Sequence, residues 1–470
     1  MKKTKVVATI SDKNCDTDFI KTLYGRGMNV VRLNTAHQTP DDTLKIVNNV
    51  RAVSDKIALL LDTKGPEIRT VKTDKRIIIN QGEKVIIKGN PHKEPDENYL
   101  YVSYEHIARD IPVGSKILID DGEIEFNVED IIGDELHCVA TNGGVVKGKK
   151  SVNIPKVSIN LPALSQKDKE YVHFAIENDI DFIAHSFVRS KEDVIEIQEI
   201  LDQHDSKIKV IAKIENQQGV DNIDEILEHV YGVMVARGDL AIEIPYEKIP
   251  GIQKMLINKC IEARKPVIIA TQMLHNMIHS PRPTRAEVSD IANAIYSKAD
   301  AIMLSGETAY GSYPAESVST MAKVAEEVEK SRSDFHEIPL MVLNNEISAL
   351  LTRKAVEISL DVDCKAIVAD SLTGRTIRGL SAYRGRKIIY AQCYDKRIVR
   401  ELSLSFGVYA NYMEPRDNAQ EFICASLQNL LKEKKLQEDD FIVILAGNFG
   451  KTQGASYIEI SSVQNLKNSK

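Results

Sequence analysis

The sequence predicts an α/β protein: a (β/α)8 TIM barrel, interrupted by an inserted all-β domain and followed by a C-terminal α/β domain. Eight apolar runs alternate with stretches of helical spacing, which is typical of a parallel barrel. Residues 71–160 break this alternation with short strand-like runs. Beyond residue 341 the alternation begins again, and 470 residues exceed what one hydrophobic core usually holds.

The barrel strands are expected where apolar runs end in polar residues. The connecting segments carry helical spacing, as in Val194, Ile197 and Leu201. We therefore assign the barrel to residues 1–70 and 161–340. Its strands are expected at residues 5–11, 28–34, 56–62, 181–187, 209–215, 232–239, 266–272 and 301–307.

Residues 71–160 are expected to form the inserted domain, which can act as a lid over the barrel mouth. Its strands are separated by Gly, Pro and Asp turns and are expected at residues 76–80, 84–89, 116–122, 124–128 and 136–140. Residues 341–470 are expected to form the C-terminal domain. Its strands are expected at 365–370, 387–392 and 441–447, with helices over 347–360 and 418–432.

Composition excludes several classes of function. A formal net charge of −7 provides no basic footprint for nucleic acid. The six cysteines are scattered without a CxxC pair, which fits a reducing cytoplasm better than a disulfide framework or a zinc site. The apolar run after MKKTK is short, so we interpret it as the first strand rather than a signal sequence. No run reaches the ~18 apolar residues of a membrane span.

Polar side chains stand at the C-terminal ends of seven of the eight expected strands, where barrels carry their catalytic groups. Turn formation alone would explain such residues at one or two strands, but it is a poor explanation for so many. They are Arg32, Asn34, Asp62, Thr63, His185, Ser186, Lys213, Glu215, Arg237, Asp239, Thr271, Gln272, Ser305 and Glu307.

Glu215 and Asp239 end neighbouring strands and could reach one ion, because adjacent strands lie ~4.8 Å apart. Two carboxylates completed by substrate and water oxygens suit magnesium or manganese, although both could simply be solvated. Gly238 lets backbone amides approach an anion, and Arg32 and Lys213 supply positive charge. These groups predict transfer chemistry on a small, multiply charged anion. Neither GxxxxGK[ST] nor GxGxxG occurs, so nucleotide binding cannot be inferred from motif spacing.

Together these motifs resemble those of the pyruvate kinase family over nearly the whole chain. The resemblance implies a barrel, a β-barrel lid inserted after the third strand, and a C-terminal regulatory domain. It also implies transfer of a phosphoryl group from phosphoenolpyruvate to ADP, in a cytoplasmic homotetramer. The motifs that carry it are MNVVRLNTAH, LDTKGPEIRT, IDDGEIEF, NGGVVKGKKSVNIP, LPALSQKDK, AKIEN, MVARGDL, ATQML, PRPTRAE and IMLSGETA.

The resemblance implies a role for each matching residue. Lys213 would stabilise charge on the transferring phosphoryl group and on the enolate oxygen, and Arg32 would contact the phosphoryl group. The amides of Gly238 and Asp239, with Thr271, would bind the substrate carboxylate, and Thr271 would help a water relay the proton. Polar support around the site is implied for Ser305 and Glu307.

Two ions and a nucleotide are also implied. Glu215 and Asp239 would hold Mg²⁺ or Mn²⁺, and Asn34, Asp62 and Thr63 would bind K⁺. Contacts with ADP or ATP are implied for Asn34, His37, Arg69 and the lid residue Lys150.

Three positions depart from the family pattern. Ala36 replaces a hydroxyl residue in the N-x-S-H stretch and removes one potassium ligand. The first loop reads TISDKN rather than TIGPAS, which puts local nucleotide contacts in doubt, and Ala241 replaces a commoner glycine. Glu67 predicts potassium dependence, because potassium-independent relatives carry a lysine there. We therefore expect potassium activation of low affinity.

The loop after the strand at 365–370 aims hydroxyls, backbone amides and an arginine at one point, as a phosphate site requires. An ordinary helix cap with a solvated arginine is the alternative. The resemblance favours an activating sugar phosphate here, with the loop Gly447–Gly454 and its Lys451 closing over a second phosphate. The loop residues are Ser371, Thr373, Gly374, Arg375 and Thr376.

Two other functions remain open at this point. A metal-dependent lyase or aldolase on a similar barrel would also use an enolate, but it would not need the inserted domain or its lysine. An inactive paralogue kept as a regulatory binding protein would not need Arg32, Lys213, Glu215, Asp239 and Thr271 together. Pyruvate formation from phosphoenolpyruvate, with and without ADP, distinguishes the three.

Overall fold

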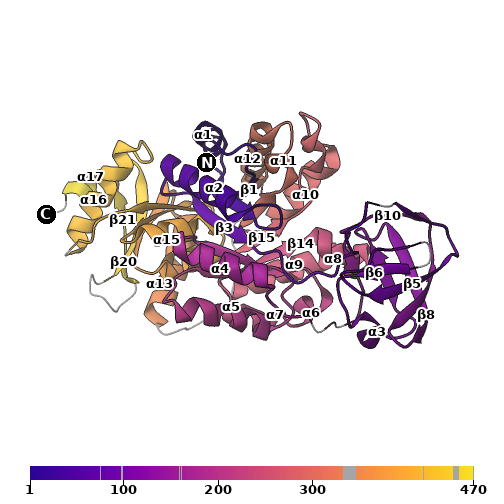
Figure 1. The fold of residues 1–470 in the computed structure, drawn as a ribbon. Coiled ribbons are helices and arrows are strands. Elements are labelled where there is room, and N and C mark those ends of the chain that lie inside the picture. The colour runs from indigo at the N-terminus through magenta and orange to yellow at the C-terminus, as the bar shows by residue number, and fades with distance from the viewer. Residues whose placement is uncertain are drawn as a thin grey trace.

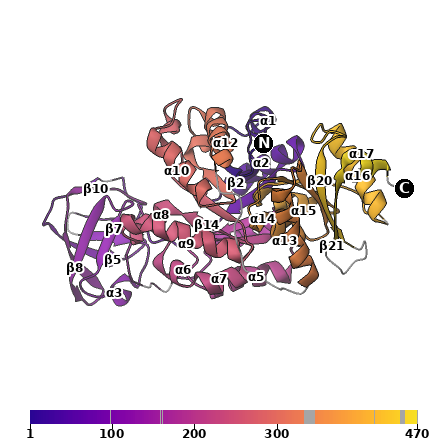
Figure 2. The ribbon, with the colours of Figure 1, turned by 180° about the vertical axis from the view of Figure 1, so that it is seen from behind.

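A computed structural model shows three sheet-containing parts in a row, with the barrel between the inserted β domain and the C-terminal domain (Figure 1). The reverse view shows the same order of parts (Figure 2). The structure describes residues 1–74, 76–96, 99–157, 159, 161–331, 346–416, 418–447 and 455–468.

The barrel is closed by eight parallel strands, which confirms the predicted (β/α)8 architecture. All eight expected apolar runs form its strands, and their order around the barrel is β1-β16-β15-β14-β13-β12-β3-β2. The strands are β1 (Lys5–Ile10), β2 (Val30–Asn34), β3 (Ala58–Asp62), β12 (Phe182–His185), β13 (Lys209–Ile214), β14 (Gly232–Ala236), β15 (Val267–Ala270) and β16 (Ala301–Leu304).

Helices surround this barrel, and several begin at side-chain caps. Thr39, Ser165 and Thr284 each start a helix with a reciprocal capping box, which satisfies backbone donors of the first turn. The helices are α1 (Thr17–Gly25), α2 (Pro40–Val53), α4 (Gln166–Glu177), α5 (Lys191–Gln203), α6 (Gln217–Asp221), α7 (Ile223–His229), α8 (Arg237–Glu243), α9 (Ile249–Glu262), α10 (Arg285–Tyr296), α11 (Gly306–Ala309) and α12 (Pro314–Ser331), with short 3-10 turns η1 (Tyr246–Lys248) and η2 (His275–Ile278).

Strand alternation divides the barrel core into two layers. Side chains such as Ile211 and Met234 pack with one another inside the barrel. Their neighbours Val210 and Ala212 pack outward against the helices. Lys213 therefore follows Ile211 on the inward face, at the end of the strand where the barrel opens.

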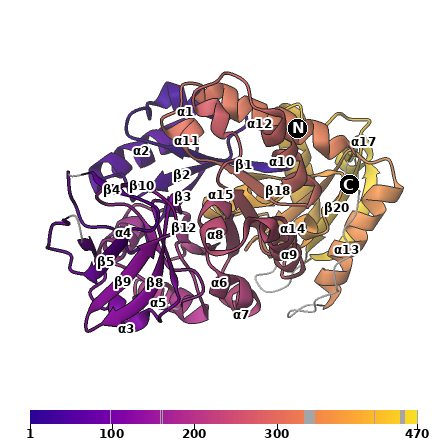
Figure 3. The same ribbon diagram turned by 90° about the vertical axis from the view of Figure 1, so that its right-hand side faces the viewer.

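The inserted domain has its own apolar core and lies at one end of the barrel (Figure 1). This end faces the viewer in Figure 3, where the inserted domain is at the lower left. Six strands form one sheet in the order β11-β7-β8-β9-β5-β6, and β10 pairs with β4 in a second sheet. The sequence missed β6, β10, β11 and a short helix. The elements are β4 (Ile77–Ile79), β5 (Lys84–Gly89), β6 (Tyr99–Val102), α3 (Ile107–Asp110), β7 (Lys116–Ile119), β8 (Ile124–Ile132), β9 (Glu135–Ala140), β10 (Gly144–Val146) and β11 (Val152–Asn153).

The C-terminal domain contains a five-stranded sheet in the order β19-β18-β17-β20-β21, in which only the β20–β21 pair is antiparallel. The two edge strands, β19 and β21, were missed by sequence reasoning. The elements are α13 (Glu346–Asp361), β17 (Ala366–Ser371), α14 (Arg375–Ala382), β18 (Ile388–Cys393), α15 (Lys396–Glu401), η3 (Leu402–Leu404), β19 (Val408–Tyr412), α16 (Ala419–Lys432), β20 (Phe441–Gly447), β21 (Ala455–Ser462) and α17 (Val463–Asn468).

The C-terminal domain packs on the end of the barrel away from the inserted domain. Leu404 is fully buried in the cluster that fills the inside of the barrel. A buried ion pair between Arg384 and Asp300, 2.5 Å apart, joins the same two parts. These contacts leave the opposite end, where the strands finish, to carry the site. Within the part of the chain that the structure describes, no helix is long and apolar enough to span a bilayer.

Candidate active site

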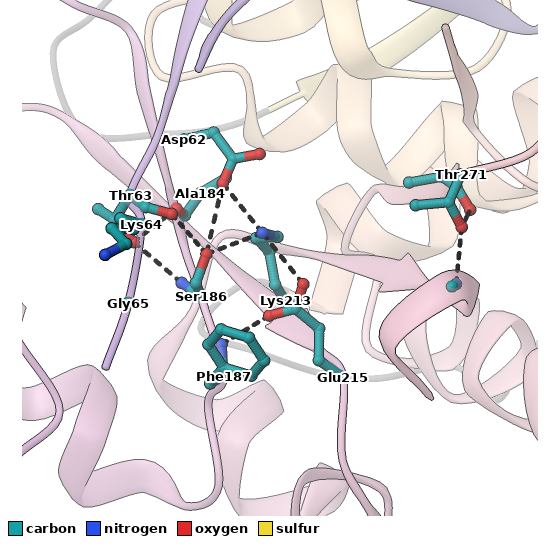
Figure 4. A network of polar contacts seen from close by, with 12 residues as sticks. Asp62, Thr63, Lys64, Gly65, Ala184, Ser186, Phe187, Lys213, Glu215 and Thr271 are labelled. Carbon is teal, nitrogen blue, oxygen red and sulfur yellow. Dashed lines mark hydrogen bonds and ion pairs between the residues drawn. The ribbon is translucent and has the colours of Figure 1, made fainter. Parts of the chain in front are cut away.

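Lys213 stands at the centre of a buried polar network where the barrel strands end (Figure 4). Its Nζ lies 3.0 Å from Asp62 Oδ1 and 3.0 Å from Glu215 Oε1. It also donates a hydrogen bond of 2.7 Å to Ser186 Oγ. Arg32 Nε donates to the other oxygen of Asp62 at 2.5 Å. Consecutive strands β13, β12, β3 and β2 bring these residues together.

The charges in this network stabilise one another. Burial opposes the charge on Lys213, but Asp62 and Glu215 outweigh burial and raise the pKa of its ammonium group well above the usual value. Burial would raise the pKa of Asp62, yet Arg32 and Lys213 outweigh it and lower that pKa. Lys213 therefore remains an ammonium ion and Asp62 a carboxylate at neutral pH.

Glu215 and Asp239 form a carboxylate pair beside the ammonium group. Burial is the main cause that raises the pKa of Glu215 to about 7, and the charge of Asp239 adds to the effect. Burial likewise raises the pKa of Asp239, while its hydrogen-bond contact with Glu215 lowers it. The amide of Phe187 donates to Glu215 Oε2 at 2.7 Å. Two carboxylates in contact repel when both are ionised, and this donor set fits a hard divalent cation.

Thr271 lies apart from Lys213, at the end of β15 (Figure 4). Its φ of 70° is left-handed, which is unusual for a β-branched residue. Thr271 Oγ1 accepts a 2.8 Å hydrogen bond from the amide of Gly238 and donates to Ala270 O at 2.7 Å. Arg237 donates to Thr271 O at 2.8 Å and forms an ion pair with Asp290 at 2.6 Å. Arg237 thus anchors the strained loop that presents Thr271.

Comparison with known families shows to which family this chain belongs. The family model described as "Pyruvate kinase, barrel domain" matches residues 1–318, and "Pyruvate kinase, alpha/beta domain" matches residues 350–461. The chain belongs to the pyruvate kinase family. The resemblance read from its motifs is therefore confirmed, and the protein is an enzyme of this family.

Individual relatives agree with this assignment. A pyruvate kinase of Borreliella burgdorferi is 45% identical over 468 residues, which cover 98% of both chains. One of Staphylococcus aureus is 43% identical over 95% of this chain and 78% of the relative. The crystal structure of a pyruvate kinase from Cryptosporidium parvum has a TM-score of 0.92 at 32% identity and covers 98% of this chain and 96% of its own.

A charge of the inserted domain acts on the carboxylate pair of this pyruvate kinase family member. The charges of Asp121 and Glu67 act on Asp239 and contribute to its raised pKa, after the larger effect of burial. Lys150 forms a 2.6 Å ion pair with Asp120, next to Asp121 in the same turn. The turn and the lid lysine therefore lie on the side of the inserted domain that faces the barrel mouth.

The other expected nucleotide residues lie around the same mouth. Arg69 forms an ion pair with Glu67 at 2.7 Å and donates to Lys149 O at 2.6 Å. His37 is exposed in the turn after β2, where its amide donates to Asn34 O at 3.3 Å. Neither residue belongs to the buried Lys213 network.

The expected potassium ligands are near one another, but their oxygens already have partners. Asp62 accepts from Arg32 and Lys213, as described above. Thr63 Oγ1 donates to Ala184 O at 3.3 Å, and Asn34 Oδ1 accepts from the amide of Ala36 at 3.2 Å. Ala36 itself has no hydroxyl to contribute.

Two strand-end residues support the site from outside it. Glu307 is buried and accepts hydrogen bonds from the amides of Leu274 at 3.1 Å and Ser305 at 2.7 Å. It thereby ties the loop that contains Thr271 to the end of β16. His185 points elsewhere: it is fully buried, and burial lowers its pKa while Asp193 opposes that shift.

Sequence reasoning missed the part that Ser186 and Phe187 play. The sequence places Ser186 at a strand end but assigns it no role, and the Phe187 contact is made by its backbone amide. Asp168 was also missed: its Oδ1 accepts from the amides of Lys64 at 2.9 Å and Gly65 at 3.4 Å. The sequence contains Asp168 in an S-x-x-D capping box. That motif predicts the start of a helix, but it does not predict the contact with the backbone after β3.

The structure describes the first of the two loops expected to bind the effector, residues 371–376. Ser371 Oγ accepts from the amide of Gly374 at 2.8 Å, and Gly374 has a left-handed φ of 76°. The helix α14 then begins at Arg375. Arg375 and Thr373 are exposed, whereas Thr376 is half-buried. Of the expected second loop, residues 448–454, including Lys451, lie outside the described residues.

Proposed function

We propose that this enzyme transfers the phosphoryl group of phosphoenolpyruvate to ADP and yields pyruvate and ATP. The P–O bond to the enol oxygen breaks, a bond to the terminal phosphate oxygen of ADP forms, and a proton adds to the enolate carbon. The observation that carries the proposal is the buried ammonium of Lys213 beside the Glu215–Asp239 pair. A coupled assay for pyruvate, with and without ADP, tests it.

That assay also separates the alternatives. ADP-dependent pyruvate supports the kinase, and pyruvate formed from another substrate without ADP supports a lyase or aldolase. No product under any condition supports an inactive paralogue.

Lys213 and Arg32 are proposed to stabilise the charge that is transferred. Both are cations held by Asp62, so their positions are fixed before substrate binds. Lys213 would face the phosphoryl group and the enolate oxygen, and Arg32 the phosphoryl group. Glu215 and Asp239 would hold Mg²⁺ or Mn²⁺, which when bound supplies positive charge to the substrate oxygens.

Thr271 and the turn at Gly238 are proposed to bind the substrate carboxylate. The Gly238 amide and Thr271 Oγ1 are 2.8 Å apart and so lie beside one position. To bind the carboxylate, they would have to release their present acceptors, Thr271 Oγ1 and Ala270 O. The amide of Asp239 would add a third donor to the carboxylate. Thr271 would then hold the water that protonates the enolate, and its anchored left-handed backbone keeps the hydroxyl in place.

ADP and ATP are proposed to bind between the barrel mouth and the inserted domain. Asn34 and His37 would contact the nucleotide from the barrel side, and Arg69 and Lys150 from the lid side. The ion pairs of Arg69 with Glu67 and of Lys150 with Asp120 hold these cations near the mouth. Closure of the lid would exclude water, which otherwise accepts the phosphoryl group.

We propose potassium activation of low affinity. Asn34, Asp62 and Thr63 supply the oxygen ligands, and their present contacts would have to adjust. Ala36 supplies none. Glu67, where potassium-independent relatives carry a lysine, supports dependence on the ion.

We propose that a sugar phosphate, such as fructose 1,6-bisphosphate or a monophosphate, activates the enzyme at Ser371, Thr373, Gly374, Arg375 and Thr376. Gly374 has a left-handed φ, and α14 begins at the exposed Arg375. The backbone amides at this helix start and the guanidinium group of Arg375 would together donate to a phosphate group. The effector would favour a state with higher affinity for phosphoenolpyruvate.

Saturation curves for phosphoenolpyruvate with each sugar phosphate test the effector site, in the parent and in Arg375→Ala. Half-saturation should fall in the parent and respond less in the variant. A parent that ignores every sugar phosphate, or a variant that responds like the parent, refutes the site.

We also propose a cytoplasmic homotetramer whose domains are residues 1–70 with 161–340, 71–160 and 341–470. The family resemblance supports the assembly, and the separate apolar core of the inserted domain supports its boundaries. Sedimentation equilibrium of the full chain tests the assembly.

A further inference from the structure

Three oxygen atoms surround the Lys213 ammonium group, one through a hydrogen bond and two through ion pairs. An ammonium group has three N–H donors and no acceptor. The three partners of Lys213 Nζ are Asp62 Oδ1 at 3.0 Å, Glu215 Oε1 at 3.0 Å and Ser186 Oγ at 2.7 Å. A substrate oxygen would therefore have to compete with these three partners for the ammonium group.

The direction of the hydrogen bonds around Ser186 is determined. Because Lys213 can only donate, Ser186 Oγ must accept from it. The hydroxyl proton of Ser186 then goes to Thr63 O, at 2.6 Å, while Asp62 Oδ1 lies farther away at 3.4 Å. Ser186 therefore links the ammonium group of Lys213 to the backbone after β3 through two hydrogen bonds.

The backbone holds Ser186 in place independently of Glu215. The amide of Ser186 donates to Thr63 Oγ1 at 3.0 Å. Gly65 passes so close that a Cβ added there would lie 2.8 Å from Ser186 Cβ. Two hydrogen bonds and close backbone packing therefore fix the hydroxyl, and a shift of even a few tenths of an ångström would meet resistance.

The three partners of Lys213 differ in how easily they can leave. Asp62 is held by Arg32, and Ser186 is held by Thr63. Glu215 is held through its other oxygen, Oε2, which accepts from the amide of Phe187 at 2.7 Å, so Oε1 can leave the ammonium group without breaking that hydrogen bond. Glu215 is also the partner that the proposed function makes a metal ligand.

We propose that Ser186 is a positioning residue for Lys213. With Asp62, it holds the ammonium group in position, so that the contact with Glu215 is the one that exchanges for the phosphoryl group of the substrate. This inference rests on the proposed function, and it adds a residue to which the sequence assigned no role. The hydroxyl does not touch the substrate; it acts by limiting where Lys213 can point.

The test compares Ser186→Ala and Ser186→Cys with the parent. Alanine removes the acceptor, and cysteine keeps nearly the same shape but provides only a weak acceptor. Both variants should lower kcat by about 10- to 100-fold with little change in the KM for phosphoenolpyruvate, because misplacement of a catalytic group by about 1 Å has costs of that order. Ser359→Ala is the matched control, since Ser359 is fully buried and donates to Val356 O at 2.7 Å. The control should retain the parent kcat.

A second measurement needs no turnover. Electron paramagnetic resonance gives the Mn²⁺ dissociation constant of each variant without substrate, and both Ser186 variants should stay within about threefold of the parent. A kcat near that of the parent in Ser186→Cys overturns the proposal even if Ser186→Ala does not fold. So does a loss of Mn²⁺ affinity as large as the loss of kcat, because the hydroxyl would then act through Glu215. If the parent has no ADP-dependent activity, the proposed function is wrong. If the parent is active and the Ser186 variants are unaffected, only the role proposed for Ser186 is wrong.

Discussion

Replacing Lys213 by methionine should nearly abolish phosphoryl transfer while leaving the fold intact. Methionine is an unbranched side chain only one atom shorter than lysine, and it removes the charge. At the 3.0 Å that separates Nζ from Glu215 Oε1, two unit charges interact by about 5 kcal/mol in an effective dielectric of about 20. A similar distance to a phosphoryl oxygen would correspond to at most about 10⁴-fold in rate. Because part of this attraction exists before transfer, we expect kcat to fall on the order of 10³-fold.

The assay is coupled pyruvate formation at saturating ADP, Mg²⁺ and K⁺, with circular dichroism as the check on folding. Lys209→Met is the matched control, since Lys209 begins the same strand at its opposite end and lies 3.9 Å from Glu401. The control should keep the parent kcat. A Lys213→Met enzyme within about tenfold of the parent would refute the assignment, because no charge facing the transition state would then have been lost.

Three further predictions concern ions and pH. Glu215→Gln and Asp239→Asn should each weaken Mn²⁺ binding by at least about tenfold, measured by electron paramagnetic resonance. If both variants bind Mn²⁺ as tightly as the parent, these two residues do not form the metal site. Ala36→Ser should lower the K⁺ concentration for half-maximal activity, and full parent activity in buffer free of K⁺ and Na⁺ would exclude the dependence. Burial lowers the pKa of His185, against the opposing charge of Asp193, so the unfolded chain binds a proton that the folded chain does not. Stability to urea should therefore fall as pH drops below about 6.5, by up to ~1.4 kcal/mol per pH unit from this group. His185→Gln should flatten the slope, and an unchanged slope would contradict the argument.

The sequence predicted the barrel well because its signals are local. A buried parallel strand shows as an apolar run, and each run that was identified became a strand of the closed barrel. The missed strands have weaker signals. β19 and β21 lie at the edges of their sheet and are largely half-buried or exposed, so hydrophobic alternation is diluted there. The two residues of β11 are too few to show any period.

The candidate site was predicted as a set of residues but not as a set of contacts. Strand-end position identified Lys213, Glu215, Asp239 and Thr271, because the fold places such residues at one mouth. Their partners could not be read in the same way. Asp62 was expected among potassium ligands, and the structure shows it in ion pairs with Arg32 and Lys213.

The sequence by itself determined which segments form the barrel strands, which side chains end them, and to which family the chain is similar. Those properties depend on side-chain period and on residue identity, which are legible along the chain. The tertiary structure alone decided that Ser186 accepts from Lys213, that Arg237 anchors the loop of Thr271, and that Leu404 closes the far end of the barrel. Such contacts join residues far apart in sequence, and only the register of neighbouring strands and the closure of the barrel bring them within hydrogen-bond or packing distance.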